Sequence, residues 1–101
     1  MRVVLTQVAE NDLGSIFTYI EKDLQNPTAA RNIATKILRR IQYLESFPEA
    51  GASLGENDPK FNSFRYLVVD NYLTFYKVDD DQVLVLRILY ARSNYLQLLG
   101  S

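Results

Sequence analysis

The stretch FRYLVVDNYLTFYKVDDDQVLVLRILY, residues 64–90, decides the fold because three β-type segments follow one another directly. The segments Phe64–Val69, Tyr72–Val78 and Val83–Tyr90 are rich in β-branched and aromatic residues, which favour strands. Asp70-Asn71 predicts a two-residue hairpin turn, and Asp79-Asp80-Asp81 predicts a longer turn rather than a cation site. Three sequential antiparallel strands are therefore expected.

The first half of the chain shows helical spacing instead. Arg2–Thr6 is short and β-branched and predicts a first strand. Apolar residues at helical intervals predict one helix over about residues 8–24 and a second from Pro27 to about Leu44, with Asn26 as its N-cap. Glu49–Asn62 predicts a loop, and Ser93–Leu99 predicts a short closing helix.

The predicted order is β-α-α-β-β-β-(α) in a single domain spanning residues 1–101. Helices followed by a run of strands favour the α+β class. We therefore expect a helical hairpin packed on one face of a mostly antiparallel four-stranded sheet. The first strand, Arg2–Thr6, is expected to lie at an edge where a partner could add a strand.

Composition excludes several classes of function. The chain has no cysteine and no histidine, which argues against thiolate chemistry, histidine general bases and zinc sites, so no metal or cofactor is expected. A net charge of -1 and a pI near 5.3 argue against affinity built on many phosphate contacts. No segment approaches the roughly 20 apolar residues of a membrane span, and no signal peptide is visible, so a cytoplasmic protein is expected.

Short motifs lie along the chain in a fixed order and spacing. They are Ala9, Asp12-Leu13, Ile16 and Tyr19-Ile20 in the first helix, Phe47-Pro48-Glu49-Ala50-Gly51 after the second, and Arg65–Val69, Asn71–Val78 and Leu86–Leu89 in the strands. Together these motifs resemble the RelE/ParE superfamily of toxins from type II toxin–antitoxin systems. The resemblance implies a growth-inhibiting protein that a co-expressed antitoxin neutralises in a hetero-oligomer. RelE-like members cleave mRNA on the ribosome, whereas ParE-like members poison DNA gyrase.

The residues favour the ParE-like mechanism within this resemblance. The arginine that RelE-like enzymes carry after the tyrosine of the third strand is replaced by Leu73, and the late histidine of related ribonucleases is replaced by Tyr90. A non-enzymatic gyrase poison is therefore the leading hypothesis. The alternatives are a ribosome-dependent mRNA endoribonuclease and a degenerate toxin that only binds antitoxin.

Four residues are the candidates for contact with the target, or for catalysis if the chain is a ribonuclease: Arg65, Arg87, Arg92 and Tyr95. Arg87 is predicted to share a strand face with Val83, Val85 and Leu89. Its charge in an apolar strand has two interpretations, contact with a target or antitoxin, or an ion pair with a carboxylate such as Asp12 or Glu49.

Other features also have two interpretations. The strand tyrosines, among them Tyr66, Tyr72, Tyr76 and Tyr90, could stack on nucleobases, but sheet packing is favoured. The basic face of the second helix, with Arg31, Lys36, Arg39 and Arg40, is either a solvated face or an attraction for an acidic partner segment. A disordered antitoxin tail with an apolar helix is expected to fold onto the helix pair or the sheet edge.

Overall fold

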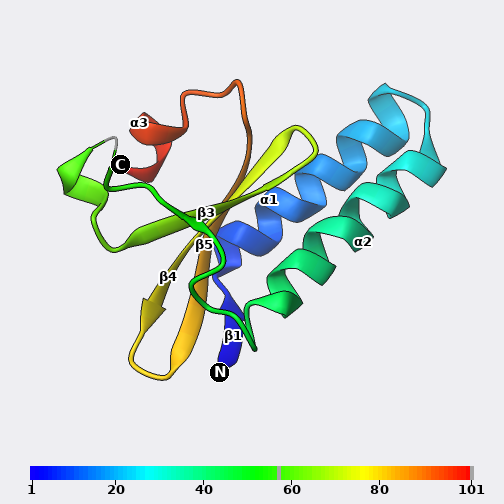
Figure 1. Ribbon diagram of the computed structural model, residues 1–101. Coiled ribbons are helices and arrows are strands. Elements are labelled where there is room, and N and C mark those ends of the chain that lie inside the picture. Colours follow the sequence, from blue (N-terminus) through cyan, green and yellow to red (C-terminus); the bar gives the residue numbers. More distant parts are fainter. Residues whose placement is uncertain (57, 101) are drawn as a thin grey trace.

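The computed structural model describes residues 1–56 and 58–100. Figure 1 shows a helical hairpin on one side of a strongly twisted sheet, with a short helix near the C-terminus on the other side. The helical segments are α1 (Gln7–Thr18), the π-helical turn η1 (Tyr19–Asp23), α2 (Pro27–Tyr43), the 3-10 turn η2 (Pro59–Phe61) and α3 (Tyr95–Leu99). The strands are β1 (Arg2–Leu5), β2 (Ala52–Ser53), β3 (Phe64–Val69), β4 (Tyr72–Asp79) and β5 (Gln82–Tyr90).

The strands form one sheet in the order β1-β5-β4-β3-β2. β1 runs parallel to β5 at one edge, and the other neighbours are antiparallel, so the predicted α+β class and mostly antiparallel sheet are confirmed. The predicted strand count of four was one short. The extra strand β2 has two residues inside the predicted loop, and so short a segment has no detectable period.

Both hairpin turns contain two residues. Asp70 and Asp80 adopt φ angles of 52° and 55°, a left-handed conformation that Asp tolerates better than most residues. The prediction of a longer second turn was wrong, because Asp79 pairs with Gln82 and only Asp80-Asp81 lie between the strands.

The helix boundaries follow local hydrogen bonds. The Thr6 side chain accepts a bond from the Ala9 N–H at 3.0 Å, and the Asn26 side chain accepts one from the Ala29 N–H at 3.1 Å. Both are N-caps of the expected type. The predicted first helix is divided, however, because the α-helix ends at Thr18 and a π-helical turn, Tyr19–Asp23, follows. The closing helix begins at Tyr95, two residues later than predicted.

Buried side chains form a cluster on each face of the sheet. On the hairpin side, residues of α1 and α2 pack against the sheet: Ala9, Ile37, Ile41, Leu44, Leu67, Val69, Tyr76, Val83, Val85 and Ile88. On the other side, Leu54, Phe61, Leu73, Phe75 and Leu89 are covered by Tyr95, Leu96 and Leu99. The fold therefore covers a second face as well as the face predicted to carry the helical hairpin.

A bulge in β5 determines the direction in which Arg87 projects. Tyr76 pairs with Val85 and Phe75 pairs with Arg87, so Leu86 is an extra residue on β5. An extra residue inverts the alternation of side chains along a strand. The prediction that Arg87 and Leu89 share a face with Val83 and Val85 was therefore wrong, since Leu89 packs in the second cluster and the two valines pack in the first.

Candidate functional site

Arg87 is held by Asp12 of α1. Its Nε and Nη2 donate to the two carboxylate oxygens of Asp12 at 2.8 and 3.1 Å, and the Ile88 N–H donates to the same carboxylate at 3.0 Å. The hydrogen bonds that Arg87 donates to Asp12 raise the pKa of Arg87, against a smaller opposing effect of burial. The ion-pair interpretation with Asp12 is confirmed, and the geometry fastens α1 to β5.

Arg65 and Tyr76 both fix the loop that contains Pro48 and Gly51. Arg65 Nη1 donates to the Gly51 carbonyl at 2.8 Å, and the Tyr76 hydroxyl donates to the Pro48 carbonyl at 2.8 Å while it accepts from the Gly51 N–H at 2.9 Å. A Cβ on Gly51 would lie 2.7 Å from the Tyr76 ring, which explains the glycine. Burial raises the pKa of Tyr76, although the Gly51 hydrogen bond lowers it.

Arg92 and Tyr95 follow β5 in different environments. Arg92 is exposed and forms no ion pair with any residue that the structure describes. Tyr95 is half-buried and stacks on Phe75, with ring centroids 5.4 Å apart. Beside it lies a cavity of about 250 Å³, lined by Leu54, Tyr66, Leu73, Phe75, Ala91 and Tyr95.

The four predicted site residues do not converge on one point. Arg65 lies opposite Tyr76 and bonds loop carbonyls, whereas Arg87 lies opposite Phe75 and turns toward α1. Their predicted roles in target contact or catalysis stay predictions. Of the four, Arg92 is the one with a free guanidinium in the described part of the chain.

A cleft of about 580 Å³ lies between α1 and η1 on one side and the adjoining ends of β4 and β5 on the other. Three tyrosines from three elements border it, Tyr19, Tyr72 and Tyr90, and we call it the tyrosine cleft. The rings of Tyr72 and Tyr90 meet edge to face at 5.9 Å. Burial raises the pKa of the Tyr72 hydroxyl, and the neighbouring hydroxyls of Tyr19 and Tyr90 raise it further.

The tyrosine cleft exposes large apolar groups. Tyr19 is 50% exposed, Leu24 is 55% exposed and Tyr90 is 44% exposed. Ile16 and Leu89 also line the cleft. Large exposed side chains gathered around a concavity are typical of a surface that binds another protein.

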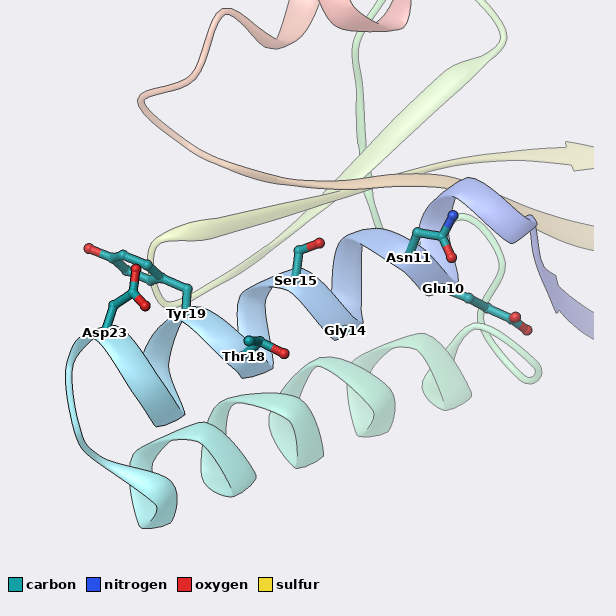
Figure 2. Close-up of a pocket in the computed structure, with 7 residues that line it drawn as sticks. All are labelled: Glu10, Asn11, Gly14, Ser15, Thr18, Tyr19 and Asp23. Atoms are coloured by element: carbon teal, nitrogen blue, oxygen red, sulfur yellow. The ribbon is translucent and has the colours of Figure 1, made fainter.

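A second, more polar cleft of about 670 Å³ runs along the same helix (Figure 2). Ser15 and Tyr19 border both clefts, so the two clefts are neighbours on α1 and η1. Figure 2 shows Tyr19 beside Asp23 at one end of the second cleft and Glu10 at the other. Among the described residues, no lysine or arginine lines either cleft, and no group of three acidic side chains could hold a metal ion.

The tyrosine cleft was only partly predictable from the sequence. Tyr72 and Tyr90 were predicted to stack or pack, but Tyr19 and Leu24 were not predicted to lie beside them. The π-helical turn explains the omission of Leu24, because the Leu24 N–H bonds to the Tyr19 carbonyl five residues earlier and the wider spacing moves Leu24 off the predicted helical stripe. Tyr19 lay outside that stripe from the start. Over residues 1–56 and 58–100, no helix combines the length and apolarity needed to cross a bilayer.

Comparison with known proteins identifies the family. The family model of the ParE toxin of type II toxin–antitoxin systems, parDE, matches residues 3–95. No curated protein matches the chain.

Two solved structures share the fold. A chain described as the chromosomal ParDE toxin–antitoxin system from P. aeruginosa is 21% identical with a TM-score of 0.76, covering 91% of this chain and 97% of that one. A YoeB/ParE toxin from Agrobacterium tumefaciens is 15% identical with a TM-score of 0.61, covering 89% of this chain and 98% of that one. At these identities the two structures support the fold alone, while the family model spans nearly the whole sequence. The chain therefore belongs to the ParE toxin family of type II toxin–antitoxin systems.

Proposed function

We propose that this toxin inhibits growth by binding and poisoning DNA gyrase, without catalysing a reaction itself, and that a protein antitoxin holds it inactive. The observation that carries the proposal is the internal engagement of the predicted ribonuclease residues. Arg87 is held by Asp12, and Arg65 is held by the Gly51 carbonyl. The match to the ParE family model supports the same assignment.

The chemistry of RNA cleavage argues in the same direction. Attack by a 2′-hydroxyl needs a proton acceptor, a proton donor and cations that stabilise the charged phosphorane. Tyr95, one of the four predicted candidates for catalysis, stacks on Phe75 beside a cavity that no described lysine or arginine lines. A surface that works by binding alone needs none of these groups.

The proposed contact with the target combines the tyrosine cleft with Arg92. The turn after β5 is held by the Ser93 N–H and hydroxyl, which donate to the Tyr90 carbonyl at 2.9 and 2.6 Å. Arg92 therefore lies on a short, fixed turn directly beyond Tyr90. Tyrosine and arginine are the residue types that most often dominate binding energy in protein interfaces.

The test is a supercoiling and cleavage-complex assay of DNA gyrase with the purified chain, with and without its antitoxin. We expect inhibition that the antitoxin reverses and that Arg92→Ala or Tyr90→Ala weakens by roughly tenfold or more. Arg31→Ala is the matched control, because Arg31 is an exposed arginine on α2 without an ion pair to any described residue.

Equal inhibition by Arg92→Ala, Tyr90→Ala and the control would exclude the proposed contact surface. No inhibition by the wild-type chain at large excess would refute the gyrase assignment. Ribosome-dependent mRNA cleavage would then be measured with the Arg65, Arg87, Arg92 and Tyr95 variants.

A further inference from the structure

α2 is a helix of one charge sign. Residues 27–43 contain Arg31, Lys36, Arg39 and Arg40 and no Asp or Glu, in a chain whose net charge is -1. The charge of Lys36 is partly neutralised by Asp70, whose Oδ2 lies 3.3 Å from the Lys36 Nζ. The three arginines are exposed and form no salt bridge with any residue in 1–56 or 58–100. Their positive field is therefore available to a partner.

An aromatic stack continues this positive surface past the end of α2. The Arg40 guanidinium lies 5.7 Å from the centroid of the Tyr43 ring, and that ring stacks on Phe47 at 4.7 Å with an interplanar angle of 24°. Tyr43 is 46% exposed and Phe47 is 54% exposed. A hollow of about 450 Å³ lies beside the two rings.

The fold does not account for Phe47. In the stretch Phe47–Gly51, Pro48 and Gly51 bond the Tyr76 hydroxyl and so fix the loop to the sheet. Phe47 belongs to neither core cluster and presents more than half of its surface to solvent. A large aromatic side chain left outside the core beside uncompensated arginines indicates a contact with another molecule.

We propose that Arg39, Arg40, Tyr43 and Phe47, called the α2 patch, bind an acidic segment of the antitoxin that carries one large apolar side chain. The carboxylates of this segment would pair with the two arginines, and its apolar side chain would pack on the exposed rings. The inference rests on the membership of the chain in a toxin–antitoxin family and does not depend on gyrase as the target.

The surroundings of the α2 patch favour a protein segment over nucleic acid. Glu45 and Glu49 are exposed and lie next to Phe47 in the sequence, so negative charge flanks the aromatic end of the patch. A polyphosphate backbone would be repelled there, whereas an apolar side chain would not. The segment therefore carries its acidic residues toward Arg39 and its apolar residue toward Phe47.

The α2 patch is distinct from the tyrosine cleft, which has no lysine or arginine among its described lining residues. An antitoxin segment bound to the patch leaves that cleft open. Binding at the α2 patch would raise the local concentration of the rest of the antitoxin near the toxin surface. Loss of this contact should therefore weaken the complex without abolishing it.

The experiment is a calorimetric titration of the purified antitoxin into the wild-type toxin and into two variants, Arg39→Glu/Arg40→Glu and Phe47→Ala. We expect the dissociation constant to rise roughly 10- to 100-fold for the double charge reversal and roughly tenfold for Phe47→Ala. The control is Lys22→Glu, which reverses an exposed cation of η1 outside the patch and should bind as the wild type does. Growth arrest on expression of each variant alone verifies that it is folded.

Measurements on the wild-type chain keep the inference testable if a variant does not fold. Antitoxin binding should weaken with added salt, and hydrogen exchange of residues 39–47 should slow in the complex. Unchanged exchange there, or unchanged affinity of both variants, would overturn the inference and leave the gyrase proposal intact. A fluorescent oligonucleotide that binds the wild type but not the charge reversal would assign the patch to nucleic acid instead. Antitoxin binding by a toxin that leaves gyrase unaffected would refute only the proposed target.

Discussion

Replacing Asp12 with alanine should destabilise the protein more than any ordinary surface substitution, because three donors lose their acceptor together. They are the Arg87 Nε and Nη2 groups and the Ile88 N–H, at 2.8 to 3.1 Å. The Asp12 side chain is 14% exposed and the Arg87 side chain is 24% exposed, so water reaches the site poorly. Asp12→Ala therefore leaves a half-buried charge and a backbone donor without a protein partner.

The magnitude follows from these two losses. An orphaned buried N–H costs about 1–3 kcal/mol. Exposed ion pairs contribute about 0–1 kcal/mol, and a fully buried pair that loses one partner costs about 3–5 kcal/mol. The Asp12–Arg87 pair is partly buried, so its loss should cost about 1–2 kcal/mol. We expect Asp12→Ala to lower the free energy of unfolding by about 3 kcal/mol. Arg87→Met should cost less, about 1–2 kcal/mol, because the Ile88 N–H keeps its acceptor.

Urea denaturation followed by circular dichroism measures these values for Asp12→Ala, Arg87→Met and the double variant. The double-mutant cycle should give a coupling of at least about 1 kcal/mol. Asp12→Asn is the control, because its amide oxygen can still accept from the Ile88 N–H while its charge is gone. A loss below about 1 kcal/mol for Asp12→Ala, or strictly additive variants, would refute the view that this pair fastens α1 to β5.

The remaining predictions concern a helical glycine and a buried tyrosine. Gly14 has no atom within 4 Å of the position that a Cβ would take, and its φ is not positive. Gly14→Ala should therefore raise the free energy of unfolding by about 0.5–1 kcal/mol in the same assay, and a loss of stability would contradict this. Tyr76→Phe removes the hydroxyl that bonds Pro48 and Gly51 and should cost about 1–3 kcal/mol. Burial raises the pKa of Tyr76 above its ordinary value of 10.0, so its protonated form stabilises the fold fully below that pH, and this contribution is lost as the pH rises through the raised pKa. Raising the pH from about 9 to about 11 should therefore lower the free energy of unfolding of the wild type more steeply than that of Tyr76→Phe. Parallel curves of unfolding free energy against pH would show that Tyr76 is not the cause.

The sequence predicted the regular parts of the fold because its signals there are periodic or local. The cap at Asn26 and the three long strands all lie where propensity and patterning place them. Apart from the missed strand β2, the main failures concern single residues that change a register. One extra residue at Leu86 and one widened turn at Tyr19–Asp23 leave no mark on composition or apolar spacing.

The candidate site was less accessible to sequence reasoning for a related reason. The pairing of Arg87 with Asp12 was one of two open interpretations, because a pattern cannot show which of several carboxylates is near. Tyr19, Tyr72 and Tyr90 come from three elements and meet only in the folded chain. Arg92 was among the predicted candidates, and its exposure on the turn after β5 keeps it available for the proposed contact.

The parallel pairing of β1 with β5 also affects when the chain can fold. Arg2 pairs with Gln82, and the Thr6 hydroxyl donates to the Leu86 carbonyl across 80 positions of sequence. During synthesis the first strand has no partner until about 80 further residues exist, an interval of roughly 4–16 s at 5–20 residues per second. Closing so long a loop also slows the search for the native pairing. Completion of this sheet must therefore wait until β5 has been synthesised, so an incomplete sheet edge is exposed during that interval.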